Sequence, residues 1–172
     1  EYYFFYDKPF PPHKESFSHI HHIVAGPPAR HPFLWKYWYD LRIPRLLKKH
    51  KAEVFFSPDG ICSLHTNLPQ VLAIHDLAFL HYPQYMPKTQ QWFYQHYTPA
   101  FIRKAKKIIT VSSFSRSDLI KHYPFAKDKI EVVYNAADPA FRPFTWTEKE
   151  SWKDSFTEGR EYFLYVGSVH PR

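Results

Sequence analysis

Short runs of β-branched and aliphatic residues recur along the chain, and each run ends abruptly in polar side chains. The runs cover residues 52–57, 71–74, 108–111, 130–134 and 162–166. Runs this apolar are typical of strands that are covered on both faces. Helical patterns lie between them, so the alternation predicts βαβ units and an α/β fold whose mostly parallel sheet has helices on both faces.

The segment before these runs is richer in aromatic residues and prolines. Residues 2–6 are predicted to form a strand, and residues 23–25 a second short strand that ends at a Gly-Pro-Pro turn. Residues 32–50 carry an apolar face that is broken at Pro44. This break predicts either two short helices or one kinked helix.

Two of the helices predicted in the second half of the chain are a long one and a short polar one. The first spans residues 88–107, where Pro99 is expected to introduce a kink. The second is a short polar helix over residues 147–158. The buried stripe of the first helix has a spacing of four residues and consists of Phe93, Tyr97, Phe101 and Ala105.

Polar residues collect at the carboxyl ends of the predicted strands. In open parallel sheets, ligands bind outside the carboxyl ends of the strands. The predicted architecture therefore indicates a binding site at these ends. Ser112 or Ser113 is also expected to cap a helix that runs to about residue 122, whose first amides either hold a phosphate or form an ordinary capped end. The strand-end residues are His75, Asp76, Ser112, Ser113 and Asn135.

Size and composition are those of a folded domain. The chain has 172 residues with 44% hydrophobic content, which is enough for a sizeable core. Its one cysteine, Cys62, cannot form an intrachain disulfide, which favours a reducing, cytoplasmic setting. No apolar stretch approaches the ~20 residues that a membrane-spanning helix needs.

The net charge of +7 comes with two basic clusters, at residues 42–51 and 103–107. Each cluster closes a helical pattern. The clusters are either solvated last turns that complement the helix dipole or a contact surface for an anionic partner, which would be a membrane surface, an anionic acceptor or a nucleic acid. No nucleic-acid reader motif is present, so no nucleic-acid partner is expected.

A metal site is not predicted. His19, His21 and His22 lie close together, but no carboxylate or thiol stands near them at ligand spacing. These histidines are instead expected to belong to a polar, partly exposed strand.

Five motifs, in this order, resemble the amino-terminal domain of family 4 glycosyltransferases, which are retaining enzymes of the GT-B fold. Any one of them alone is weak, whereas five in order and at suitable spacing are specific. They are residues 38–47 (WYDLRIPRLL), 71–83 (VLAIHDLAFLHYP), 109–119 (ITVSSFSRSDL), 130–143 (IEVVYNAADPAFRP) and 163–172 (FLYVGSVHPR).

The resemblance implies two Rossmann-like domains that face each other across a cleft. The first receives the acceptor, and the second holds the sugar nucleotide. Residues 1–143 would be the acceptor-side domain, incomplete at its start, and residues 144–172 a linker and the first strand of the second domain. The implied reaction moves a sugar from a nucleotide-diphosphate sugar to a hydroxyl of a glycan or lipid-linked acceptor, with no cofactor and no metal.

The resemblance also implies roles for individual residues on the acceptor side. His75 matches the family's cleft histidine, with a core histidine satisfied by backbone as the alternative. Asp76 is expected to orient His75 or to cap the following turn rather than to act as a base. Residues 79–87, rich in aromatic residues and prolines, form either a loop that faces the acceptor or a packed surface loop.

On the donor side, Gly167 lies in the family's glycine turn and Arg172 matches a basic position of the motif, so Gly167, Ser168 and Arg172 are expected to bind the nucleotide sugar. Ser168 stands where many relatives carry an arginine. The family's glycine loop, with the central strand before it, would precede Glu1, and the family's two glutamates would follow Arg172. The fragment is therefore expected to be poorly stable and inactive as a transferase. The alternatives are an epimerase or phosphorylase of the same architecture, or a noncatalytic binding module with a basic and aromatic surface.

Overall fold

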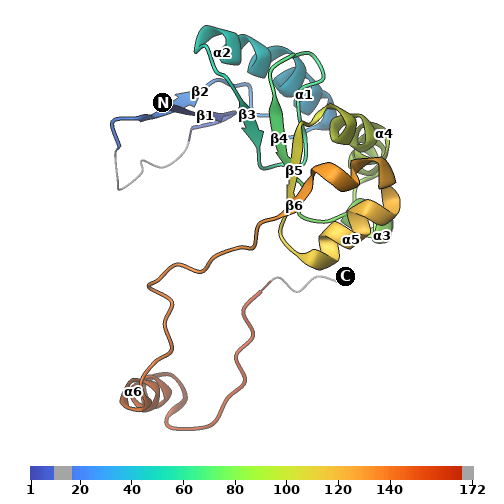
Figure 1. Ribbon diagram of the computed structural model, residues 1–172. Helices are drawn as coiled ribbons and strands as arrows, with labels where there is room; N and C mark the ends of the chain where they lie inside the picture. Colours follow the sequence, from blue (N-terminus) through green and yellow to red (C-terminus); the bar gives the residue numbers. More distant parts are fainter. Residues whose placement is uncertain (10–16, 168–172) are drawn as a thin grey trace. The chain divides into compact units, whose positions relative to one another are not determined.

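The computed structural model describes residues 1–9 and 17–167 and divides the chain into two compact units. The first unit comprises Glu1–Tyr134, and the second begins at Asn135. This division falls before the predicted boundary at residues 143 and 144. The first unit holds the sheets and all but one of the helices in the described part of the chain (Figure 1).

Both sheets of the first unit are parallel. A two-stranded sheet pairs β1 (Tyr2–Tyr6) with β2 (Ile20–Val24), and Tyr2 lies opposite Ile20. A four-stranded sheet has the order β3-β4-β5-β6, all in parallel register. Its strands are β3 (Phe55–Ser57), β4 (Gln70–Ala73), β5 (Lys107–Thr110) and β6 (Ile130–Val132). The predicted α/β class with a parallel, Rossmann-like sheet is confirmed.

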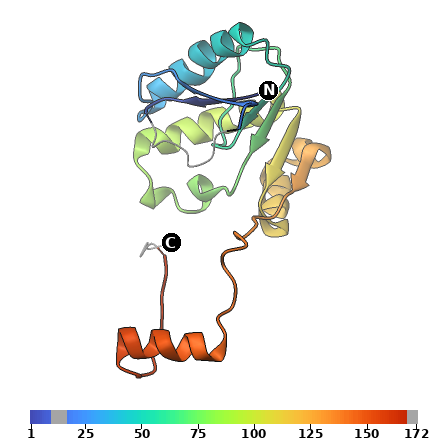
Figure 2. The same ribbon diagram turned by 90° about the vertical axis from the view of Figure 1, so that its left-hand side faces the viewer.

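Helices alternate with these strands as the sequence predicts, and α1 and α4 lie side by side in both views (Figures 1 and 2). Residues 79–87, expected as a loop, instead contain short helical turns. The helical elements of the first unit are α1 (Pro32–Tyr37), the π-helix η1 (Trp38–Arg42), α2 (Ile43–Lys49), α3 (Ala78–His81), the 3₁₀ helix η2 (Pro83–Tyr85), α4 (Lys88–Lys104), α5 (Ser113–His122) and the 3₁₀ helix η3 (Pro124–Lys129).

Pro44 does not split the helix at residues 32–50, because a π-helical turn precedes it. The N–H of Ile43 donates to the carbonyl of Trp38, five residues earlier. In a regular α-helix, the ring of Pro44 would collide with the carbonyl of Asp40, and its missing N–H would leave that carbonyl unpaired. The π turn absorbs this conflict, so α1, η1 and α2 follow one another without a break.

The long helix α4 buries the predicted stripe. Phe93, Phe101 and Ala105 are each no more than 3% exposed, and Tyr97 is half-buried. Pro99 lies inside the helix without interrupting it. Trp35 of α1 packs edge-on against Phe93, with ring centroids 5.2 Å apart, so α1 and α4 share one core.

Burial along the four-stranded sheet is one-sided. Leu72, Ile108 and Ile130 are buried in the core that the strands share with the helices. On the other face, Phe56 is 53% exposed, and Lys107 and Glu131 form an exposed ion pair. The sheet thus differs from the expected one with both faces covered. The apolar runs are too short to fix their burial by pattern alone, and Glu131, the charged residue in the middle of β6, lies on the open face.

The second unit contains α6 (Trp146–Thr157), which begins with a capping box. Thr145 and Glu148 exchange hydrogen bonds between their side chains and backbone N–H groups. The predicted strand at residues 162–166 does not form in the described residues. Phe163, Leu164 and Val166 are all at least 75% exposed, and an apolar strand of this kind needs a neighbouring strand to satisfy its backbone.

The connection between β3 and β4 has no regular structure, yet part of it is buried. Cys62 and Ser63 are fully buried, so their backbone groups need partners inside the protein. The Gln70 side chain supplies two of them: its Oε1 accepts from the Ser63 N–H at 2.9 Å, and its Nε2 donates to the Ser63 carbonyl at 2.7 Å. One amide side chain therefore replaces a strand neighbour for Ser63.

We expect Gln70→Leu to lower the free energy of unfolding by about 2–4 kcal/mol, because it leaves two buried backbone groups of Ser63 without partners. Urea unfolding of the chain measures this loss. Gln95→Leu is the matched control, since Gln95 is exposed on α4, and it is expected to change the free energy by less than about 0.5 kcal/mol. Equal losses in the two variants would contradict the role given to Gln70.

The single thiol is chemically shielded. Burial, together with the negative charge of Asp40, raises the pKa of Cys62 to about 12. At pH 8 we therefore expect Cys62 to react with a thiol reagent at least about a thousandfold more slowly in the folded chain than in guanidinium chloride. Absorbance of the released chromophore measures both rates, and similar rates would show that Cys62 is accessible.

Candidate functional site

His75 lies at the carboxyl end of β4, in an exposed position. The strand ladder extends one residue beyond β4, since the Ile74 N–H donates to the Ile109 carbonyl at 2.8 Å. His75 Nε2 then lies 3.1 Å from the carbonyl oxygen of Pro58, which follows β3. Because a carbonyl can only accept, Nε2 carries the proton, and a neutral His75 keeps Nδ1 as an acceptor. His75 is thus bonded to backbone, as one alternative supposed, but it is not a core residue.

Asp76 caps the turn that follows it. Its Oδ1 accepts from the Ala78 N–H at 2.8 Å, at the start of α3. This is one of the roles that the sequence suggested for Asp76, and it fixes the direction in which the chain leaves the sheet. Asp76 and His75 are both exposed.

Ser112 is the cap of α5. Its Oγ accepts from the Ser115 N–H at 3.0 Å and donates to the Ser115 hydroxyl at 3.0 Å. Ser113 is the first helical residue, and its hydroxyl lies 3.1 Å from that of Tyr134, beyond β6. Both serines therefore lie at the carboxyl ends of β5 and β6, as the strand-end rule predicts.

The other predicted site residues lie outside the first unit. Asn135 is the first residue of the second unit, and Gly167 belongs to that unit as well. Ser168 and Arg172 lie outside the described residues. The structure therefore assembles His75, Asp76, Ser112 and Ser113 on one sheet edge, and their functional roles remain predictions.

Asp59 adds a carboxylate to this edge that the sequence did not single out. It follows β3 in the turn Pro58-Asp59-Gly60, where Gly60 has a φ of +71°. Tyr39 donates to Asp59 Oδ2 at 2.9 Å. Burial raises the pKa of Tyr39, and the charge of Asp59 adds to the rise. Its position after a strand was the signal that could have identified it.

Tyr94 of α4 lies within the electrostatic influence of two of these carboxylates. Burial raises the pKa of Tyr94, and the negative charges of Asp59 and Asp76 raise it further. The ends of β3 and β4 thus present two carboxylates and an imidazole beside a neutral phenol. Such groups accept hydrogen bonds from hydroxyls, which suits a ligand rich in hydroxyl groups.

Metal-ligand geometry occurs in one place among residues 1–9 and 17–167, in the group His81, Asp118 and His122. The sequence did not predict it. His19, His21 and His22, for which the sequence predicts no metal site, form no such group among these residues. Over the same residues, no helix is both long and apolar enough to cross a bilayer.

Two curated proteins are similar to this chain. It is 25% identical over 146 residues to the O-antigen chain mannosyltransferase RfbU of Salmonella typhimurium, covering 81% of this chain and 35% of that protein. It is 26% identical over 127 residues to the O-antigen chain mannosyltransferase B of Escherichia coli, covering 73% of this chain and 33% of that protein. The chain therefore spans about a third of the length of these relatives.

A glycosyltransferase of known structure from Rickettsia africae matches 80% of this chain and 36% of its own, at 19% identity and a TM-score of 0.45. The family model described as Glycosyltransferase Family 4 matches residues 2–141, which is nearly the whole first unit and most of the chain. The chain belongs to glycosyltransferase family 4.

Proposed function

We propose that this chain is the acceptor-side part of a retaining glycosyltransferase. The reaction moves a sugar from a nucleotide-diphosphate sugar to a hydroxyl of a glycan or lipid-linked acceptor. Family membership supports the reaction class, and the position of His75 supports the location of the site. Because both curated relatives are named O-antigen chain mannosyltransferases, a nucleotide-diphosphate mannose is the donor to test first.

The observation that carries this proposal is the orientation of His75. Its Nε2–H is engaged by the Pro58 carbonyl, so Nδ1 is the atom that meets the ligand. In our proposal, Nδ1 accepts a hydrogen bond from a hydroxyl of the donor sugar or the acceptor. Asp76 keeps its capping role and positions His75 through the turn rather than acting as the base.

The donor side is proposed from the motif alone. Negative charge gathers on the departing diphosphate, so N–H groups and cations should face it. We assign this task to the Gly167 turn with Ser168 and Arg172, and to Asn135 a role in binding substrate. No cofactor or metal is proposed for the transfer itself, and the 172-residue chain assayed alone is expected to be inactive.

We expect His75→Ala, in the full-length protein that contains this chain, to lower kcat by about 10²-fold, since it removes a hydrogen bond at the reacting sugar. Radiolabelled sugar transfer to a lipid-linked glycan measures this. Asp76→Asn is the companion variant: it keeps Oδ1 for the Ala78 N–H, so a capping residue predicts less than about tenfold loss, whereas a base predicts loss comparable to His75→Ala.

His96→Ala is the control, because His96 is an exposed histidine that stacks on Trp92 of α4 and is expected to leave kcat unchanged. An unchanged kcat in His75→Ala would contradict the proposed site. Loss of activity in all three variants would point to a folding defect, which circular dichroism of each variant distinguishes.

We also propose that the outer surface of α1, η1 and α2 contacts an anionic membrane. Its exposed residues are apolar at the start of α1 and basic at the end of α2, so this surface offers apolar side chains to the membrane and cations to anionic headgroups. Phe33 is 72% exposed, and Lys48 and Lys49 are exposed in the last turn of α2. The full set of exposed residues on this surface is Phe33, Leu34, Tyr37, Leu41, Arg45, Lys48 and Lys49.

The second basic cluster is less available for such a contact. Lys107 pairs with Glu131, and the Arg103 guanidinium lies 4.6 Å from the ring centroid of Phe125. Arg103 and Lys104 also lie in the last turn of α4, where cations complement the helix dipole. The helix-end interpretation therefore suits this cluster, and the membrane contact rests on α1–α2.

We expect the chain to sediment with vesicles that contain phosphatidylglycerol and to stay in solution with phosphatidylcholine vesicles. Lys48→Gln with Lys49→Gln should weaken the binding about tenfold or more, at about 1 kcal/mol for each cation. Lys121→Gln with Lys127→Gln removes the same charge from α5 and η3 and should have little effect. Equal weakening by both pairs would indicate nonspecific attraction and contradict this docking surface.

A further inference from the structure

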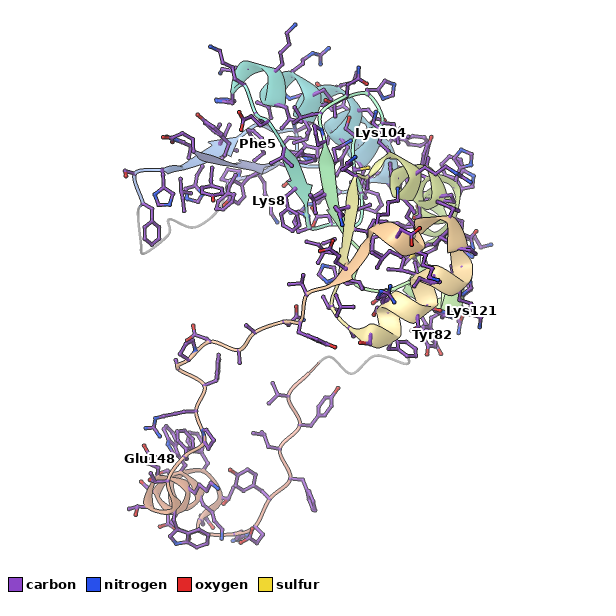
Figure 3. The ribbon with its side chains drawn as sticks, in the orientation of Figure 1. Phe5, Lys8, Tyr82, Lys104, Lys121 and Glu148 are labelled. Atoms are coloured by element: carbon purple, nitrogen blue, oxygen red, sulfur yellow. The ribbon has the colours of Figure 1, made fainter. Side chains whose placement is uncertain are left out.

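Three potential metal ligands meet where α3 and α5 approach each other. His81 is the last residue of α3, and Asp118 and His122 lie one turn apart on α5. Tyr82 and Lys121, the chain neighbours of His81 and His122, are labelled at this place in Figure 3. We propose that His81, Asp118 and His122 form a binding site for a divalent transition-metal ion such as Zn²⁺, which joins α3 to α5.

The distances are close to those that such an ion requires. His81 Nε2 lies 2.7 Å from Asp118 Oδ2, and His122 Nε2 lies 3.5 Å from Asp118 Oδ1. One ligand atom from each residue can be chosen so that all lie within 4.8 Å of one another. Tetrahedral bonds of about 2.0–2.1 Å place ligand atoms about 3.3 Å apart. Small side-chain rotations would therefore bring all three atoms to one ion.

The backbone that carries these ligands is anchored in the core on both sides. Leu77 and Phe79 are buried just before His81, and Leu119 is fully buried beside Asp118. Asp118 and His122 have the i, i+4 spacing that puts two side chains on the same helical face. The site is therefore built on fixed elements, and only its side chains need to adjust.

The ligands are accessible to an ion from solvent. The side chains of His81 and His122 are 41% and 33% exposed, whereas that of Asp118 is 13% exposed. The carboxylate is thus the most buried of the three ligands, and the two imidazoles lie nearer the surface. Water can fill the remaining coordination position, as in other zinc sites with three protein ligands.

The donor set selects the class of ion. Two imidazole nitrogens and one carboxylate suit Zn²⁺, Co²⁺, Ni²⁺ or Cu²⁺, whereas Mg²⁺ and Ca²⁺ prefer oxygen ligands throughout. Without an ion, both imidazoles face the oxygens of Asp118 through Nε2. An imidazole that binds an ion through Nε2 carries its proton on Nδ1.

The site is separate from the residues proposed for sugar transfer, but it shares an element with them. Asp76 caps α3 at its start, and His81 lies at its end. An ion bound here would fasten α3, and the turn that begins at His75, to α5. Its role would be to hold this edge of the sheet together, and it takes no part in the chemistry of transfer.

The test titrates CoCl₂ into the 172-residue chain purified without a histidine tag and follows the visible absorption of Co²⁺. We expect one equivalent to bind and Zn²⁺ to displace it. His81→Ala and His122→Ala should each weaken binding by more than about tenfold, because loss of a ligand costs at least as much as loss of a ligand's hydrogen-bond partner. Asp118→Asn should weaken it similarly.

His21→Ala is the control, since His21 belongs to β2 in the other group of histidines, and it should bind Co²⁺ like the unaltered chain. Thermal unfolding provides a second readout. Zn²⁺ should raise the Tm of the unaltered chain and of His21→Ala but not that of His122→Gln. Glutamine is chosen because it is compatible with a helix and similar in length to histidine. Absence of Co²⁺ binding, binding that survives the three ligand substitutions, or binding lost in His21→Ala would each overturn the proposal.

Discussion

The first unit depends on hydrogen bonds to the buried, irregular backbone that connects β3 to β4. The chain passes from β3 to β4 through residues 58–69, part of which lies in the core without a strand or helix to pair with. Side chains from three elements take up its polar groups. Ser57 donates to the Ile61 carbonyl at 2.5 Å, Gln70 bonds both backbone groups of Ser63, and Asp40 accepts from the Leu64 N–H at 2.8 Å. Buried backbone groups without such partners would each cost about 1–3 kcal/mol.

The π turn before Pro44 takes part in this arrangement. Three consecutive residues there, Trp38, Tyr39 and Asp40, are each no more than 7% exposed. A regular surface helix buries a stripe with a spacing of three to four residues, so consecutive burial marks an unusual turn. Asp40 contacts the buried connection, and Tyr39 contacts Asp59 at its start. The same connection begins with Pro58, whose carbonyl orients His75, so the proposed site depends on this packing.

Much of this could be predicted from sequence, and the failures have physical causes. Polar residues that follow the apolar runs placed His75, Asp76, Ser112 and Ser113 at the carboxyl ends of β4 and β5, because the direction of a parallel strand fixes where its end lies. Local pattern does not reveal what covers a strand, so the open sheet face and the unformed strand at residues 162–166 were not foreseen. The group of His81 with Asp118 joins residues 37 positions apart, which only the tertiary structure could show.

The two edge strands of the four-stranded sheet, β3 and β6, differ in how well they resist pairing with a further strand. At the β6 edge, Glu131 carries a charge in the middle of the strand and pairs with Lys107 of β5. At the β3 edge, Val54 and Phe56 are both more than half exposed, and among the described residues β4 is the one strand that pairs with β3. Unpaired apolar edges are templates for joining further strands, whereas charged edges resist it. The β3 edge, rather than the β6 edge, is therefore the one at which a further strand could extend this sheet.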